Sequence, residues 1–279
     1  MDWRLTILCE NTVSRPGLLG EHGFSAYIEL PSGNILFDTG QGFGLIQNAL
    51  RLEKSLPDVS QVVLSHGHYD HTGGLLSFLA AHGPCDVVAH PDVLAERFSW
   101  LPSGSGEKPL SIGMPWSEAY ITTRGARFQW CTTFTEIAEN VFVTGEVPRC
   151  TPFELGDPKM KVLKNGQWVI DPFLDDCSLV LKTRAGLVIV LGCAHSGLIN
   201  ILEYVTSRLG QSRIRAIVGG THLGFLSNAQ LHETILSVRK YDVELLAVSH
   251  CTGQRPVTHL ASEFGERFAF GNVGFTLSA

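Results

Sequence analysis

The sequence gathers metal-binding side chains in one short stretch, Ser-His-Gly-His-Tyr-Asp-His-Thr-Gly-Gly at residues 65–74. Imidazole and carboxylate groups are the ligands that suit Zn²⁺, Mn²⁺ or Fe²⁺. The stretch follows an apolar, strand-like run, so the two-residue period of a strand end puts His66 and His68 on the same side. The turn that follows lets Asp70 and His71 point to a second position nearby. The pattern therefore predicts a site for two adjacent divalent metal ions, with zinc as the first choice and manganese or iron as alternatives.

The elements that must position these side chains alternate between strands and helices. Short β-like runs and turns dominate the first third of the chain, and a regular helical pattern appears from Leu198 to Leu209. Further histidine-bearing turns follow the strand-like runs at 187–191 and 244–249. This order predicts an α/β fold in which two sheets carry helices on their outer sides. Because the ligand motifs must converge on one site, we expect a single domain over residues 1–279.

Composition narrows the class of protein and its partners. The 279 residues carry a formal net charge of −6, with 44% hydrophobic and 17% charged residues, which indicates a large core and excludes disorder. A pI near 6.0 and the absence of a Lys/Arg run argue against a nucleic-acid surface. No apolar stretch reaches the roughly 18 residues of a membrane span. We therefore expect no nucleic-acid or membrane partner and a small-molecule substrate.

Cysteine usage indicates the compartment. The seven cysteines form an odd set without a C-x-x-C pair, which is typical of reduced thiols rather than of a disulfide framework. The first residues lack the basic-then-apolar pattern of a signal peptide. Both features predict a cytoplasmic protein.

The histidine–aspartate stretch resembles the H-x-H-x-D-H signature of the metallo-β-lactamase superfamily. Asp38-Thr39-Gly40 looks like the first motif of that superfamily, and the segments 192–197 and 249–253 follow strands as its later ligand motifs do. A more specific likeness is to the branch of the methanopterin-related dihydropterin ribofuranosyl-aminobenzene phosphate synthases. Segments 10–12, 21–25 and 219–223 carry that likeness.

The resemblance implies a four-layer αβ/βα sandwich (the metallo-β-lactamase fold) with one or two metals held by strand-end loops. It assigns His66, His68 and His195 to one metal, and Asp70, His71 and His250 to the other. Asp38 would support the metal loop through hydrogen bonds. Most hydrolases of the superfamily have a bridging aspartate about where this chain has Cys193. The ligand that bridges the metals therefore stays open among Cys193, Asp175, Asp176 and a hydroxide.

The function implied by the resemblance is that of a metal-dependent hydrolase that uses a metal-activated water at a mono- or dinuclear His/Asp site. We assign catalytic roles to Asp70, which would orient the water and receive its proton, and to His222, which follows two glycines and suits a metal or substrate contact. His22 is expected to contact substrate. The synthase branch suggests a phosphorylated, pterin- or ribose-like small molecule as substrate.

Two alternatives to a hydrolase remain. Di-iron redox members of the superfamily have a carboxylate at the position of His68 and an appended flavodoxin-like domain, for which this chain has no residues left. A metal-stabilised protein that binds a metabolite without turnover is the other alternative, although structural zinc sites favour cysteine ligands.

Two segments stand out as insertions. Residues 100–115 read as a Gly-, Ser- and Pro-rich loop, and residues 149–174 as a polar, irregular stretch. We expect them to form a lid over the metals, with ordinary surface loops or a homodimer contact as the alternatives. Between them, residues 119–122 read as a strand.

Overall fold

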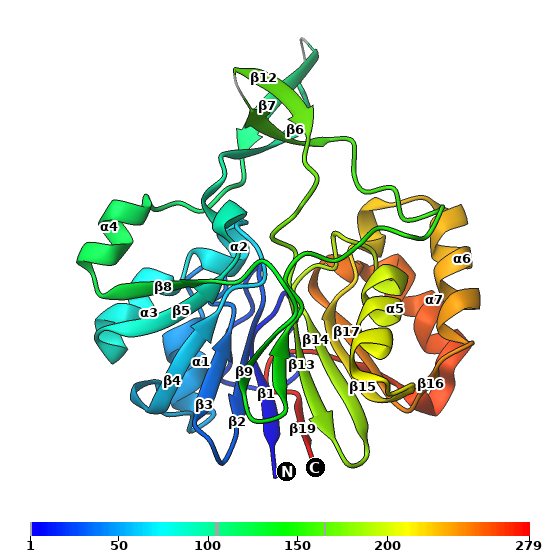
Figure 1. The fold of residues 1–279 in the computed structure, drawn as a ribbon, viewed down its shortest axis with the longest axis horizontal. Helices are drawn as coiled ribbons and strands as arrows, with labels where there is room; N and C mark the ends of the chain where they lie inside the picture. The colour runs from blue at the N-terminus through cyan, green and yellow to red at the C-terminus, as the bar shows by residue number, and fades with distance from the viewer. Residues whose placement is uncertain (1, 104–105, 165) are drawn as a thin grey trace.

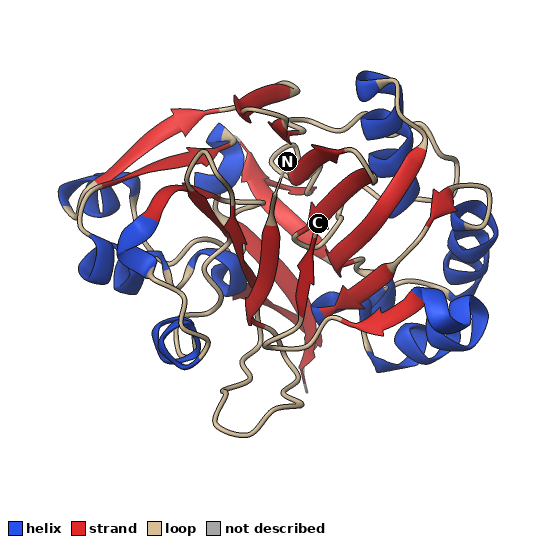
Figure 2. Ribbon diagram, turned by 90° about the horizontal axis from the view of Figure 1, so that it is seen from below, coloured by secondary structure: helices blue, strands red, loops and turns tan. Residues whose placement is uncertain are grey.

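A computed structural model describes residues 2–103, 106–164 and 166–279 of the chain. Two large β-sheets face one another in the centre, and helices cover the outer side of each sheet (Figures 1 and 2). This gives the predicted four layers in the order helix, sheet, sheet, helix. None of the helices in the described part of the chain has the length and apolar character that crossing a bilayer requires.

The first sheet is formed by the N-terminal half of the chain together with the last strand. Its strands are, in sheet order, β19 (Thr276–Ser278), β1 (Arg4–Cys9), β2 (Ser25–Glu29), β3 (Asn34–Phe37), β4 (Val59–Val63), β5 (Cys85–Ala89) and β8 (Ala126–Trp130). From β3 to β8 all neighbours are parallel. The helices of this half are α1 (Leu45–Arg51), α2 (Tyr69–Thr72), α3 (Leu75–His82) and α4 (Glu118–Thr123).

The second sheet is formed by the C-terminal half. Its strands are, in sheet order, β18 (Phe268–Phe270), β17 (Leu246–Ser249), β15 (Arg213–Gly220), β14 (Gly186–Leu191), β13 (Ser178–Thr183), β10 (Val141–Val143) and β9 (Thr135–Ala138), with β16 (Asp242–Val243) paired to β15. Strands β14, β15, β17 and β18 run parallel. The helices of this half are α5 (Leu198–Leu209), α6 (Asn228–Val238) and α7 (Gln254–Phe264). Five short 3₁₀ helices complete the described elements: η1 (Leu56–Asp58), η2 (Pro91–Leu94), η3 (Leu223–Phe225), η4 (His250–Thr252) and η5 (Gly265–Arg267).

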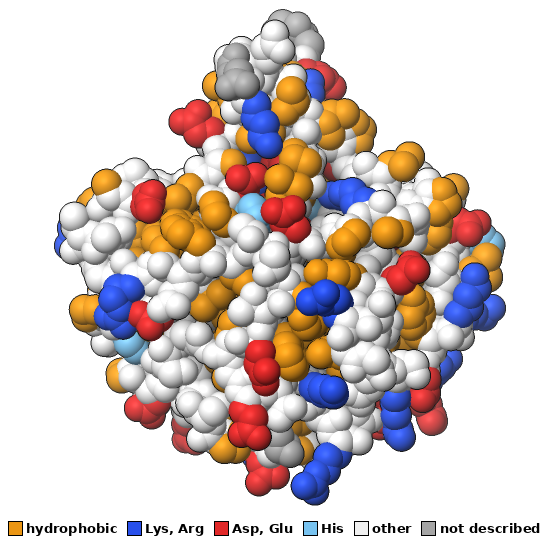
Figure 3. Space-filling view, in the orientation of Figure 1, with side chains coloured by type: hydrophobic (Ala, Val, Ile, Leu, Met, Phe, Trp, Pro, Cys, Tyr) orange, Lys and Arg blue, Asp and Glu red, His pale blue; other side chains and the backbone are white. Residues whose placement is uncertain are grey.

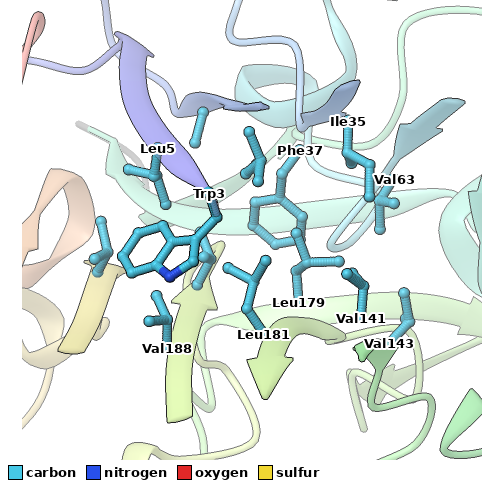
Figure 4. Close-up of a cluster of buried hydrophobic side chains, with 14 of the residues drawn as sticks. Trp3, Leu5, Ile35, Phe37, Val63, Val141, Val143, Leu179, Leu181 and Val188 are labelled. Carbon is cyan, nitrogen blue, oxygen red and sulfur yellow. The ribbon is translucent and has the colours of Figure 1, made fainter. Parts of the chain in front are cut away.

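The core is layered because the central strands are apolar on both faces. Every residue of β14 is buried. Val188 and Val190 pack in the cluster between the two sheets, whereas Leu187 and Ile189 pack in the cluster beneath the helices of the second half. A continuous apolar run is typical of a strand covered on both faces. Figure 4 shows the inter-sheet cluster, where side chains such as Phe37 of the first sheet meet those of the second.

A third, four-stranded sheet projects from one end of the sandwich (Figure 1). Its order is β12 (Gln167–Ile170), β11 (Met160–Lys164), β6 (Arg97–Ser103) and β7 (Gly106–Ser111). The prediction of a loop over 100–115 is therefore wrong for most of that segment. The irregular stretch predicted over 149–174 is wrong where it forms β11 and β12. Residues 104, 105 and 165 lie outside the described ranges. β7 is an edge strand, where a proline such as Pro109 does not interrupt a ladder.

The strand predicted over 119–122 is also wrong, because these residues lie in helix α4. Ser117 caps that helix, its hydroxyl accepting a hydrogen bond from the backbone N–H of Tyr120 at 3.3 Å. Glu118 adds a favourable negative charge in the first turn. The local cap outweighs the strand preference of the short apolar run.

Candidate metal centre

The candidate centre lies where strands of both sheets end. The loops after β4, β14, β15 and β17 carry the candidate histidines, and the last three strands run parallel, so their carboxyl ends meet at one edge of the sheet. Figure 3 shows histidine side chains in the notch below the projecting sheet. Residues far apart in sequence are thereby brought together, as the sequence predicted.

Three imidazoles converge on one position. The Nε2 atoms of His66, His68 and His195 are buried and have no hydrogen-bond partner. One ring nitrogen from each lies within 4.8 Å of those of the other two. Burial, reinforced by neighbouring positive charges, lowers the pKa of His66 and His195 well below its usual range, and burial does the same to the pKa of His68. All three rings are therefore neutral. Three neutral imidazoles with free, convergent nitrogens have the donor chemistry of a transition-metal site.

A second group of donors lies beside the first. His250 Nε2 is 3.2 Å from His71 Nε2 and 3.3 Å from Asp70 Oδ2, and the last two atoms are 3.9 Å apart. Burial opposes ionisation of Asp70, but the positive charge of His71 and hydrogen bonds from His22 and His250 hold the pKa of its carboxyl well below its usual range. The second group thus combines an ionised carboxylate with two imidazoles.

One buried carboxylate orients a histidine of each group. Asp38 Oδ1 accepts the backbone N–H of Ser65 at 2.7 Å, and Oδ2 accepts from the Ser65 hydroxyl at 2.6 Å and from His71 Nδ1 at 2.7 Å. The Ser65 hydroxyl oxygen in turn accepts from His66 Nδ1 at 2.8 Å. Both Nδ1 atoms therefore hold a proton and both Nε2 atoms face the centre. This is the supporting role that the resemblance implied for Asp38.

The contact with Asp38 also favours the positively charged form of the His71 imidazole. Burial lowers the pKa of His71, but the Asp38 and Asp70 carboxylates outweigh it and raise that pKa to about 9. In the metal-free chain His71 is therefore a cation.

Strained backbone accompanies the site. Seven non-glycine residues in the described chain have positive φ, and five of them border the donors: Asp38, Phe173, Ala194, His222 and His250. Such conformations cost about 1–3 kcal/mol each and persist where the surroundings enforce them. The turns after β14, β15 and β17 are therefore held by their packing rather than by local preference.

The projecting sheet covers the donors. A cavity of about 220 Å³ lies between them and the underside of this sheet. Leu101, Leu110, Ile112 and Met160 form an apolar wall opposite the histidines. No lysine or arginine lines this cavity among the residues that the structure describes. The two predicted insertions thus meet above the donors through the pairing of β6 with β11.

Comparisons with known proteins identify the family. A model described as the metallo-β-lactamase superfamily matches residues 19–134. The crystal structure of a metal-dependent hydrolase of the β-lactamase superfamily aligns with a TM-score of 0.84 and 28% identity, over 99% of both chains. An uncharacterized protein of Methanocaldococcus jannaschii is 30% identical over 273 residues, 97% of this chain and 98% of that protein. The chain belongs to the metallo-β-lactamase superfamily.

A further relative bears on the more specific likeness. The 7,8-dihydropterin-6-methyl-4-(β-D-ribofuranosyl)-aminobenzene-5′-phosphate synthase of Methanocaldococcus jannaschii is 28% identical over 262 residues, 89% of this chain and 86% of that protein. The resemblance to the superfamily and its αβ/βα fold is thereby confirmed. The orphaned, buried imidazole nitrogens of this chain fit the metal ions of a metal-dependent hydrolase.

Two of the candidate bridging residues are bound by other groups of the protein and belong to none of the donor sets of the described residues. Asp175 accepts from Arg97 at 2.6 Å and from the backbone N–H of Gly67 at 2.8 Å. Asp176 accepts from the backbone N–H of Ser196 at 2.8 Å. Both carboxylates hold the loops that carry the histidines. Cys193, in contrast, directs its sulfur to His71 Nε2 at 3.2 Å.

His222 and His22 both line the cavity. The rings of His222 and His195 are 4.3 Å apart between centroids. Burial opposes a charge on His222, but the Asp157 carboxylate, 3.9 Å from its Nε2, and Cys251 raise its pKa to about 9. His22 is half-exposed, with Nε2 3.2 Å from Asp70 Oδ2. Either ring is placed to contact a ligand in the cavity.

Sequence reasoning gave no role to Glu10 and Asn11, which the structure places directly behind His250. Glu10 Oε1 accepts the backbone N–H of His250 at 2.7 Å, and Asn11 Oδ1 lies 2.9 Å from its Nδ1. They orient His250 as Asp38 orients His71. The available signal was an acid and an amide directly after a buried apolar strand.

Proposed function

We propose that this chain is a hydrolase that cleaves a small molecule at two adjacent divalent metal ions, with zinc as the first choice. The observation that carries the proposal is the set of three orphaned Nε2 atoms of His66, His68 and His195, buried beside the Asp70–His71–His250 group. When bound, such ions lower the pKa of water and polarise the oxygen of the scissile group.

The chain's own residues supply orientation and proton transfer. Asp70 is ionised and lies between His22 and His250, so it can accept a proton from a water in the cavity. His22, whose half-exposed ring lies 3.2 Å from that carboxylate, connects Asp70 to solvent. His222, held as a cation by Asp157, can stabilise negative charge on the substrate or protonate a leaving group.

The cavity also indicates the form of the substrate. Its apolar wall suits the face of a heterocycle, and no cationic side chain other than histidine reaches it within the described residues. A phosphoryl group of the substrate would therefore lie beside the metal-binding histidines, and the heterocycle would lie below the projecting sheet. The 28% identical synthase supports a phosphorylated, pterin- or ribose-like molecule as the substrate class.

We propose that the protein works in the cytoplasm. All seven cysteines are free, and six of them are buried. Reduced, buried thiols are typical of cytosolic proteins.

The test combines metal analysis with hydrolysis assays. The purified protein is expected to contain divalent metal and to cleave a generic phosphodiester, lactone or thioester. The double variant His66→Ala/His68→Ala should lose both metal and activity, whereas His259→Ala, at an exposed helix position, should keep both. Full activity in the metal-free double variant would refute the proposal.

A synthase is the second candidate, because the 28% identical relative carries that name. The two reactions are separated by incubating the protein with a ribofuranosyl-aminobenzene phosphate and a dihydropterin that carries a leaving group on its 6-methyl carbon, which the aminobenzene nitrogen would displace. A joined product would favour the synthase, and release of phosphate or alcohol alone would favour the hydrolase.

A further inference from the structure

Cys193 occupies the middle of the two donor groups. Its sulfur belongs to three sets of donor atoms that each lie within 4.8 Å of one another: with His66 and His71, with His195 and His222, and with His250 and Cys251. The first metal position contributes His66 and His195 to these sets, and the second contributes His71 and His250. The Cys193 sulfur is thus within reach of both positions.

The carboxylates of the described residues do not offer a ligand that both metal positions could share. Asp70 is the one carboxylate in the donor sets of the described residues, and it faces His22 and His250 at the outer side of the second group. Asp175 is bound by Arg97 and Gly67, and Asp176 by Ser196. A ligand shared by the two positions must therefore come from another side chain or from solvent.

The backbone holds Cys193 in place. A Cβ on the preceding Gly192 would lie 2.1 Å from Ser65 Oγ, so the strand end is pressed against the serine of the Asp38 network. A Cβ on Gly219 would lie 2.0 Å from the carbonyl oxygen of Leu191. Glycines at both positions let β14 and β15 bring the Cys193 turn against the histidine loop. The side chain of Cys193 is 3% exposed, so its sulfur faces the donors rather than solvent.

We propose that the Cys193 thiolate is the ligand that the two metal positions share. The proposal rests on the metal centre of the proposed function. A thiolate is a soft ligand that favours Zn²⁺, Co²⁺ and Fe²⁺ over Mn²⁺ and Mg²⁺. This chain should consequently select zinc, cobalt or iron more strongly than a carboxylate-bridged centre does.

Cobalt substitution tests the proposal without any activity measurement. The metal-free protein is titrated with Co²⁺, and the thiolate-to-cobalt charge-transfer absorption in the near ultraviolet is recorded. We expect the band in the wild type, in Cys251→Ser, whose native sulfur accepts the His222 N–H at 3.2 Å, and in the buried control Cys177→Ser. It should be absent in Cys193→Ser and in Cys193→Asp.

Metal stoichiometry provides the second measurement. Cys193→Ser should keep one ion at His66, His68 and His195 and bind the second at least about tenfold more weakly. Cys193→Asp should restore two ions and shift selectivity towards Mn²⁺. This rescue separates a ligand from a packing residue, and circular dichroism confirms that each variant is folded.

Three results would overturn the proposal. The first is cobalt binding by the wild type without a charge-transfer band, which leaves the hydrolase proposal intact. The second is a band that survives in Cys193→Ser and disappears in Cys251→Ser, which moves the ligand to the neighbouring sulfur. The third is a wild type that binds no divalent metal, which removes the proposed function as well.

Discussion

Replacing Asp38 by asparagine tests whether one carboxylate sets the proton positions of two metal-binding histidines. The side chain is fully buried and accepts from Ser65 N, Ser65 Oγ and His71 Nδ1 at 2.6–2.7 Å. Asparagine has nearly the same shape, but it replaces one acceptor oxygen by an NH₂ donor. Each of its two side-chain orientations therefore creates a mismatch.

The expected loss of metal affinity follows from these two orientations of the asparagine amide. If the amide nitrogen faces His71 Nδ1 and Ser65 Oγ, both His71 and, through Ser65, His66 must carry their proton on Nε2, which blocks metal binding. If the amide is flipped, its NH₂ faces the Ser65 N–H and leaves a buried donor unpaired, at about 1–3 kcal/mol. That cost corresponds to about 5- to 150-fold weaker metal binding, in the range found when a metal-bound histidine loses its carboxylate partner.

The assay is competition for zinc with a chromophoric chelator, together with metal analysis of the purified variant. Asp58→Asn, at an exposed position, is the matched control and should bind zinc as the wild type does. Ser65→Ala removes the relay to His66 but leaves the His71 contact, so it should weaken binding less than Asp38→Asn. If Asp38→Asn keeps both ions with affinities within threefold of the wild type, about 0.7 kcal/mol, the tautomer argument is wrong.

The charge on His71, the ion pairs of Arg97 and the metal centre as a whole each give a further prediction. Because the pKa of His71 in the metal-free chain is about 9, a proton must leave its Nε2 before metal binds. Loss of that proton alone should raise zinc affinity roughly tenfold per pH unit up to about pH 9, and the Cys193 thiol would add a second proton. Calorimetry in two buffers should show this proton release. A flat affinity between pH 7 and 9 would contradict this. Arg97→Met leaves the buried Asp171 and Asp175 unpaired and should lower the free energy of unfolding in urea by about 3–5 kcal/mol, whereas Arg127→Met, at an exposed pair, should change it by less than about 1 kcal/mol. Zinc at a free concentration 100 times its Kd should stabilise the wild type by about 2.7 kcal/mol, and a Tm that EDTA leaves unchanged would argue against a bound metal.

The sequence predicted the parts of the site that are local in the chain. Four candidate donors fall within residues 66–71, and a strand end followed by a short helix fixes their directions. The later motifs could be placed because each follows a strand of a parallel set, and parallel strands end at one edge. Helix α5 was also predicted with its observed bounds, since its apolar spacing is regular.

Long-range pairing could not be predicted in this way. The projecting sheet depends on pairing β6 with β11, and its strands are partly exposed, so they carry little of the apolar pattern that marks a buried strand. Arg97 binds Asp171 and Asp175, which are 74 and 78 residues away. The central place of Cys193 likewise depends on how the turns after β4, β14 and β17 lie against one another, which their separate sequences do not encode.

The projecting sheet is anchored at one end only. We call the end at Arg97 its root and the far end, beyond Leu101, its tip. Arg97, at the first residue of β6, is bound to Asp175, whose second oxygen holds the N–H of Gly67 between His66 and His68. Side chains nearer the tip, such as Leu101, touch the cavity without joining this network. A library confined to the tip could thus redirect substrate choice while the donor geometry is conserved. Mutations at the root would instead alter the centre itself, so the two halves of this small sheet can evolve at different rates.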